Sequence, residues 1–457
     1  MLDLLIKNGR LVEKDRIYEA NIGIKDGKFE VITNPERMLE AAETVDARGN
    51  YVFPGIIDCH AHINEPGFTW REDFETGTRA AAVGGTTTLI DMPLNNEPPL
   101  TDTDTFERKQ ELASKKAVVD YSFWGGLVND NLKDLEPLAQ KGVAAFKAFV
   151  CPMGESVFTS VNMGQVQEAL KILKPQQVIS GFHCEEYGII QENVARAKAE
   201  GKNSVRDFLN AHSVLSEYIA AKNIIDISRE TGGRVHICHV SHPSVAQIVK
   251  DAIHEGLNVT AETCPHYLGF TEDLVIEKGA PAKCTPPLRT KESAEKLWDY
   301  VLDGTLSCIG SDHSPADEKE KSNEINTIWT AWGGLNAIQF LLPMMFDMAV
   351  HKRGYSPTLL NRTLCYNPAK LFKLYGRKGA FGIGFDADVV IVDPDREWEI
   401  TKESLMTKNK VSAFEGVKGR GCPTHTFVRG KLVAENGMYK DMFGHGEYIY
   451  PVREGVE

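Results

Sequence analysis

The chain has no basic stripe, no run of like charges that could serve as a linker, no low-complexity tract and no internal repeat. Charged residues make up 25% of the sequence and the formal net charge is -13, so the electrostatic field repels nucleic-acid backbones. The N-terminal segment from Met1 to Asn8 lacks a long hydrophobic run, because charged residues are mixed into a very short apolar stretch. We therefore expect no nucleic-acid partner, no signal peptide and no membrane span.

The sequence also lacks the cysteine pattern of a disulfide-bonded protein. The nine cysteines are an odd number and none forms a Cys-x-x-Cys motif. This pattern predicts reduced thiols in a reducing compartment rather than a disulfide framework. A cytoplasmic location is the expectation that follows.

Eight short apolar runs alternate with segments of helical apolar spacing between Tyr51 and Asp312. The runs cover residues 51–57, 86–90, 118–124, 143–150, 177–182, 234–238, 257–261 and 306–309, and the clearest helical segments are 73–83, 161–173, 213–229 and 244–255. Alternating strands and helices indicate a parallel sheet, and eight such units predict a (β/α)8 TIM barrel. An open doubly wound sheet is the competing fold, but it would spread the strand ends along a line.

The two ends of the chain have a different pattern. Both alternate apolar and polar residues between glycine turns, as half-exposed antiparallel strands do. We predict a small β-sandwich domain built from both termini, with a structural role. The predicted division is residues 1–50 for its N-terminal part, 51–378 for the barrel, and 379–457 for its C-terminal part and the tail.

Two histidines follow the first apolar run. His60 and His62 are two residues apart at the end of a strand, so they point to the same side and can bind one cation. Such a pair is a weak signal alone, because surface histidines often produce it.

A lysine interrupts the fourth apolar run. Lys147 stands in a segment expected to be buried on both faces, where an unpaired charge is costly. It could form a salt bridge with a buried acid or extend to the strand end. Alternatively, its neutral amine could react with carbon dioxide, and the two oxygens of the carbamate could bridge two divalent cations.

Three further candidates end apolar runs. His183, His239 and Asp312 follow the fifth, sixth and eighth runs. Each alone is more typical of a core or loop residue, but the carboxyl-terminal rim of a barrel houses catalysis. Their shared position predicts a single site.

These residues carry a resemblance that covers nearly the whole chain. Residues 54–62, the lone lysine, the two later histidines and residues 310–315 resemble the amidohydrolase superfamily, in its cyclic amidase branch of dihydroorotases, hydantoinases and allantoinases. The resemblance implies a binuclear centre with a hydroxide and a carboxylated Lys147 bridging both metals. In it, His60, His62 and Asp312 hold one cation, and His183 and His239 hold the other. Zinc is the first expectation, while manganese, cobalt, nickel and iron suit the same ligands.

The expected chemistry is hydrolysis of a cyclic amide. Two cations about 3.5–4 Å apart can lower the pKa of a bridging water and draw on the carbonyl oxygen. Asp312 then takes the proton of the attacking hydroxide and passes it to the departing nitrogen. We also expect a homotetramer.

Motifs around the metals indicate the substrate. Dihydroorotases generally carry an arginine where this chain has Asn64, and hydantoinases usually have a tyrosine that residues 148–153 lack. Residues 64–67, 92–96, 283–289, 311–315 and 331–334 instead resemble allantoinases, which hydrolyse allantoin, a cyclic ureide, to allantoate in purine catabolism. The predicted pocket residues are Asn64, Asn95, Thr285 and Trp332, with turn or packing roles as the alternative.

Three other functions stay open at this point. A hydantoinase or dihydropyrimidinase is the nearest, and a dihydroorotase is disfavoured by Asn64. A non-catalytic hydantoinase-like scaffold is disfavoured because every ligand is intact. His266 and His313, beside the motifs, are expected to support the site rather than bind metal.

Overall fold

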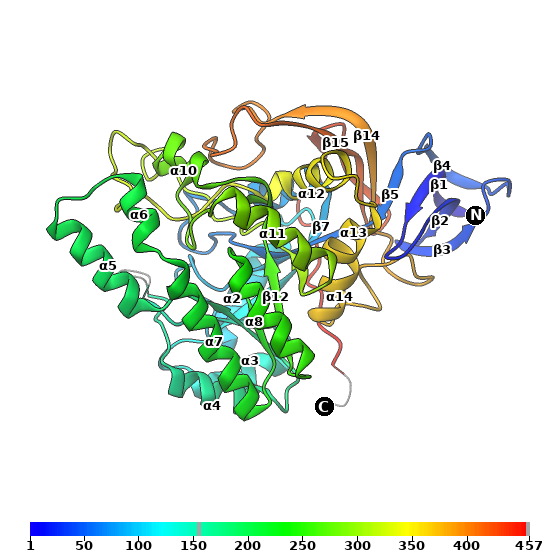
Figure 1. Ribbon diagram of the computed structural model, residues 1–457. Coiled ribbons are helices and arrows are strands. Elements are labelled where there is room, and N and C mark those ends of the chain that lie inside the picture. Colours follow the sequence, from blue (N-terminus) through cyan, green and yellow to red (C-terminus); the bar gives the residue numbers. More distant parts are fainter. Residues whose placement is uncertain (153–156, 454–457) are drawn as a thin grey trace.

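A computed structural model describes residues 1–152 and 157–453 of the chain (Figure 1). The last residue of the 148–153 segment and the last four residues of the predicted tail lie outside the described residues. Two sheets organise the described chain. One has eight strands from the middle of the sequence, and the other has nine strands from its two ends.

The eight-stranded sheet is the predicted barrel. Its strands pair in chain order and every pair is parallel. A bridge between Ala61 and His313 brings the two end strands together, so the sheet is a nearly closed barrel and the open-sheet alternative is excluded. The strands are β6 (Ile56–Ala61), β7 (Thr86–Asp91), β8 (Asp120–Gly126), β9 (Ala145–Phe149), β10 (Ile179–His183), β11 (Val235–Ile237), β12 (Val259–Thr263) and β13 (Leu306–Ile309).

Helices connect these strands, and the four clearest predicted helices are confirmed. They are α1 (Phe74–Val83), α4 (Met163–Leu173), α7 (Val214–Thr231) and α8 (Pro243–His254). The Asp73 side chain accepts a hydrogen bond from the Thr76 amide and begins α1 as an N-cap. The remaining α-helices are α2 (Thr103–Lys116), α3 (Leu135–Lys141), α5 (Tyr187–Ala199), α6 (Val205–Ala211), α9 (Pro265–Gly269), α10 (Glu272–Lys278), α11 (Lys291–Leu302), α12 (Leu341–Phe346), α13 (Thr358–Asn361) and α14 (Asn367–Leu371).

One predicted strand is divided between the two sheets. Residues 51–57 were expected to form the first barrel strand, but β5 (Tyr51–Pro54) pairs with strands of the other sheet and the barrel begins at β6. A Cβ atom at Gly55 would lie 1.9 Å from Thr87 Oγ1, so only glycine fits where the chain passes between the sheets. Because both halves of the run are buried, hydrophobicity alone could not mark the boundary.

The nine-stranded sheet combines both termini, as predicted. Its strands are β1 (Leu2–Val12), β2 (Ile17–Lys25), β3 (Lys28–Thr33), β4 (Ala41–Asp46), β5, β14 (Val389–Glu399), β15 (Lys418–Val428), β16 (Lys431–Glu435) and β17 (Met438–Tyr439). Residues from both ends, including Ile22 and Val389, share one apolar core. The buried Lys378 ammonium contacts Asp120 of β8 at 2.5 Å and Asp388 at 2.8 Å, which ties this domain to the barrel.

All nine cysteines are free thiols, as predicted. Every helix within residues 1–152 and 157–453 is too short or too polar to cross a membrane.

Candidate metal centre and its pocket

The six predicted metal ligands meet at the carboxyl-terminal rim of the barrel. They are His60 in β6 and His62 just after it, Lys147 in β9, His183 at the end of β10, His239 after β11 and Asp312 after β13. The side chains of the histidines and the lysine are buried, and that of Asp312 is 15% exposed. Parallel strands place their carboxyl ends on one rim, which is why residues far apart in the sequence converge here.

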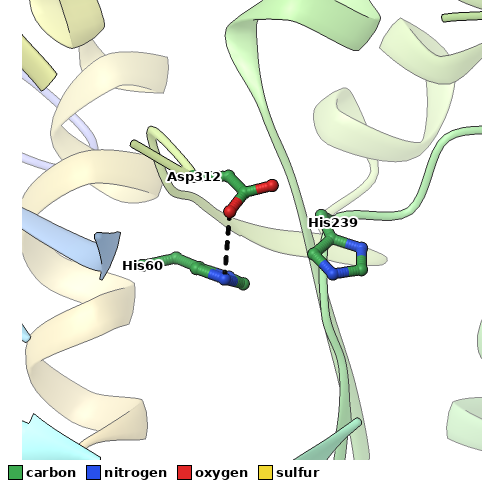
Figure 2. Close-up of side chains that lie close together, drawn as sticks. All are labelled: His60, His239 and Asp312. Atoms are coloured by element: carbon green, nitrogen blue, oxygen red, sulfur yellow. Dashed lines mark ion pairs between the residues drawn. The ribbon is translucent and has the colours of Figure 1, made fainter. Parts of the chain in front are cut away.

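Two close groups form within this set. Asp312 Oδ1 lies 3.3 Å from His60 Nε2 and 3.4 Å from His62 Nε2. The other group joins His183 Nδ1 to His239 Nε2 at 3.1 Å. Figure 2 shows the Asp312 carboxylate above the His60 ring, with His239 beside them, and these three residues offer ligand atoms within 4.8 Å of one another.

The backbone turns sharply at two of these positions. His239 has φ 38° and Asp312 has φ 46°, in the left-handed region that residues other than glycine rarely adopt. Strain of this kind concentrates at functional sites, where it directs a side chain to a required place. The turns aim both side chains at the centre of the rim.

Buried donor atoms at the rim fit a metal centre. Among the described residues, His60 Nε2, His62 Nδ1, His239 Nδ1 and Lys147 Nζ have no hydrogen-bond partner. A buried polar atom without a partner is costly, and histidine nitrogens with a carboxylate suit divalent cations. Lys147 is 1% exposed and its ammonium is 5.1 Å from the centre of the Phe149 ring, so it has no polar contact to account for its burial.

Two carboxylates behind the ligands were missed by the sequence analysis. Glu262, at the end of β12, contacts His60 Nδ1 and lies 3.3 Å from His236 Nε2. Glu185 accepts from His183 Nε2 and from His212 Nδ1, both at 2.9 Å. A carboxylate on the far nitrogen of a ligating histidine fixes the orientation of its ring.

These carboxylates also set the charge of the rim. Burial lowers the pKa of an imidazole, but Glu262 and Asp312 outweigh it and raise the pKa of His60 to about 10. Burial lowers the pKa of His62 to about 4. A cation that binds at His60 must displace its proton, so metal binding is coupled to proton release.

Glu262→Gln is expected to weaken metal binding about 10- to 100-fold, because the amide keeps the shape but loses the charge that orients His60. Titration against a chelator measures the affinity. Glu318→Gln, at an exposed position, is the matched control. Equal affinity in the two variants would contradict this assignment of Glu262.

A cavity of about 860 Å³ opens above the ligands. Of the predicted pocket residues, Asn95, Thr285 and Trp332 line it, together with apolar side chains from the β9 and β10 connections such as Phe149, Phe158 and Phe208. Their contacts with substrate stay predictions.

Asn64 lies elsewhere. It is fully buried, it is outside the cavity lining, and its Nδ2 donates to the main-chain oxygen of Asn95 at 3.4 Å. Asn95 itself has φ 59°. Asn64 therefore contacts the backbone of Asn95, and a contact between Asn64 and substrate stays a prediction.

The cavity also holds an arginine that the sequence analysis did not select. Arg71 Nε lies 3.0 Å from both carboxylate oxygens of Glu320, and its guanidinium lies 3.8 Å from the centre of the Trp332 ring. Because Glu320 neutralises it, Arg71 offers no free charge to a substrate carboxylate.

Comparison with known proteins agrees with this geometry. Residues 51–433 match the amidohydrolase family. The chain belongs to this family. It is 38% identical to an allantoinase of Rubrobacter xylanophilus over 100% of this chain and 99% of that protein, and 36% identical to an allantoinase of Deinococcus radiodurans over 96% of each. The predicted resemblance to allantoinases is thereby confirmed.

Solved structures of the same branch share the fold. An L-hydantoinase (dihydropyrimidinase) from Arthrobacter aurescens has a TM-score of 0.96 and 33% identity, and covers 98% of this chain and 100% of its own. A dihydropyrimidinase from Brevibacillus agri has a TM-score of 0.91 and 28% identity, and covers 99% of this chain and 100% of its own. The predicted barrel with a domain from both termini is confirmed.

Proposed function

We propose that this protein is a metal-dependent allantoinase, which opens the hydantoin ring of allantoin to give allantoate. The observation that carries the proposal is the match over nearly the whole chain to relatives named allantoinase, at 36–38% identity. The match of residues 51–433 to the amidohydrolase family supports hydrolysis of a cyclic amide.

The rim residues would hold two divalent ions. His60, His62 and Asp312 would bind one, His183 and His239 the other, and a carboxylated Lys147 would bridge both. Zinc is the first candidate, and manganese, cobalt, nickel and iron suit the same ligands. When bound, such ions supply an activated water and polarise the carbonyl that it attacks.

Asp312 moves the proton in this scheme. Burial alone would raise the pKa of its carboxyl, but His60, His62 and His239 hold that pKa below its usual range. The carboxylate is therefore ionised at neutral pH and accepts the proton of the attacking water. It then gives this proton to the ring nitrogen as the carbon–nitrogen bond breaks, which leaves a carboxylate and a ureido group.

The remaining pocket residues would orient the ring. Asn95, Thr285 and Trp332 line the cavity and are the proposed substrate contacts, while Asn64 acts through Asn95. The proposed setting is purine catabolism in the cytoplasm by a homotetramer, and light scattering of the purified protein tests the subunit count.

A substrate panel tests the function. Allantoin is expected to be hydrolysed at least about 10²-fold more efficiently than dihydroorotate, because an unpaired carboxylate in a desolvated pocket costs several kcal/mol. The arginine of the cavity lining, Arg71, already pairs with Glu320. The panel contains allantoin, hydantoin, dihydrouracil and dihydroorotate with metal-reconstituted protein, and a preference for dihydroorotate would refute the proposal.

Hydantoinase or dihydropyrimidinase activity is the second candidate. The TM-score of 0.96 to an L-hydantoinase and the apolar side chains around the cavity favour it. Efficient turnover of hydantoin and dihydrouracil, with little turnover of allantoin, would select this alternative. A non-catalytic scaffold has no support, because every predicted ligand position is intact. A dihydroorotase has no support either, because the described cavity lining contains no arginine that is free to bind a substrate carboxylate.

A further inference from the structure

One wall of the cavity is a long segment without regular structure. Between Ile309 and Ile338, all of which is described, the chain forms no α-helix and only isolated bridges. We call residues 317–334 the wall segment, because it lines the cavity with Glu320, Asn326, Trp329, Thr330, Ala331, Trp332, Gly333 and Gly334. A loop of this length depends on side-chain contacts for its shape.

Lys321 is the first of two buried lysines that hold the wall segment. It is 5% exposed, and its ammonium donates to the main-chain oxygens of Ala280 at 3.2 Å, Lys283 at 3.0 Å and Trp332 at 2.8 Å. An ammonium has three N–H groups, so these bonds use all of them. Lys321 thus joins the wall segment to residues 280–283 on the rim.

Lys283 makes the reverse connection from the rim to the wall segment. It is 8% exposed, and its ammonium donates to the main-chain oxygens of Trp329 at 3.1 Å and Ala331 at 2.7 Å. Its own main-chain oxygen accepts from the Gly334 amide at 3.0 Å. The two lysines therefore cross-link the same pair of segments from opposite sides.

Neither ammonium has a compensating acid. In the described part of the chain, no carboxylate oxygen lies within 4.0 Å of either Nζ atom. Burial lowers the pKa of Lys321 to about 7 and that of Lys283 to about 8. The ammonium of Lys283 also lies 5.3 Å from the centre of the Phe208 ring, and the hydrogen bonds of both amines go to carbonyls alone. Desolvated amines held in this way are costly to retain, so filling space does not explain why a lysine stands at either position.

The cross-link lies next to two predicted substrate contacts. Thr285 lies two residues after Lys283, and Trp332 accepts the shortest bond of Lys321. The Trp332 indole donates to the main-chain oxygen of Ser314 at 3.2 Å, close to Asp312. A Cβ at Gly334 would lie 2.4 Å from that oxygen, so the wall segment packs directly on the rim.

We infer that Lys283 and Lys321 are positioning residues that hold the wall segment on the rim and so set how tightly the cavity binds the substituent of its substrate. They act through Trp332 and Thr285, and Lys283 itself also lines the cavity, whereas Lys321 does not. The choice of allantoin as substrate rests on the proposed function, whereas the mechanical role of the lysines does not.

The test compares Lys321→Met and Lys283→Met with Lys319→Met, an exposed neighbour on the same segment. Methionine has nearly the length of lysine but no N–H donor, and the substitution leaves no buried acid unpaired. We expect KM for allantoin to rise roughly tenfold in the first two variants, with kcat changed less than about threefold and metal content unchanged. The rise in KM should be smaller for hydantoin, which lacks the ureido substituent.

Hydrogen exchange gives a readout that is independent of the substrate. Amides of residues 317–334 should exchange faster in both buried-lysine variants and at the wild-type rate in Lys319→Met. Unchanged exchange and KM would overturn the inference, and so would equal losses of kcat and metal. If Lys321→Met does not fold, Lys283→Met and the milder Lys321→Gln carry the same test. If the wild-type protein does not hydrolyse allantoin, the proposed function fails, while exchange and KM for hydantoin or dihydrouracil still test the lysines.

Discussion

Lys147→Ala is expected to lose both metal ions and to lower kcat/KM by roughly 10³-fold or more, because the bridging oxygens of the proposed carbamate cannot form without the amine. Lys147 is a buried rim group that lacks any polar partner among the described residues. Burial lowers the pKa of His239, and the charge of Lys147 lowers it further. An unmodified ammonium at this place would oppose cation binding. Metal stoichiometry and activity of the purified variant measure the two losses.

Chemical rescue distinguishes a carbamate on Lys147 from a role of Lys147 in packing alone. Added short carboxylic acids should restore part of the metal and the activity in Lys147→Ala, where the shortened side chain leaves space for them. Lys147→Met fills that space without an amine, so we expect it to lose metal and to resist rescue. An unmodified lysine in a crystal of active, metal-loaded protein would rule out the carbamate.

The metal ligands could be predicted from sequence because each one interrupts or ends an apolar run. A buried strand offers no solvation for Lys147, and a barrel gathers the ends of its strands on one rim, so chemistry-bearing residues at those ends must meet. The same reasoning could have found Glu262, which ends the short run of β12. Like Lys147 in β9, Glu262 is a charged residue in a buried strand, and such a residue indicates a functional site.

Contacts between loops have no sequence pattern comparable to the apolar runs that mark the metal ligands. Arg71 and Glu320 are 249 residues apart, and neither belongs to a periodic segment, so their pairing over Trp332 required coordinates. Asn64 is predicted in the pocket by its position after the histidine pair, and in the structure its side chain donates to the main-chain oxygen of Asn95, a residue of the cavity lining. Sequence position gives the neighbourhood of a loop residue, whereas the direction of its side chain depends on the packing around it.

Asp312→Asn is the second substitution with a large expected effect. Asparagine has the size of aspartate and one carbonyl oxygen in place of the carboxylate, so it can still contact His60 and His62. Four histidines and Lys147 remain to bind the metals. We therefore expect much of the metal to stay while kcat for allantoin falls by roughly 10²-fold or more, since no group is left to carry the proton.

The geometry makes Asp312 the group best placed for this proton. Its Oδ1 atom lies within 3.4 Å of the His60 and His62 rings, and the partly exposed carboxylate faces the cavity. His266 is also buried nearby, but burial lowers its pKa to about 4 and it does not line the cavity. Asp395→Asn, on the surface of β14, controls for loss of one charge. Turnover near the wild-type rate in Asp312→Asn, with full metal, would mean that another residue transfers the proton.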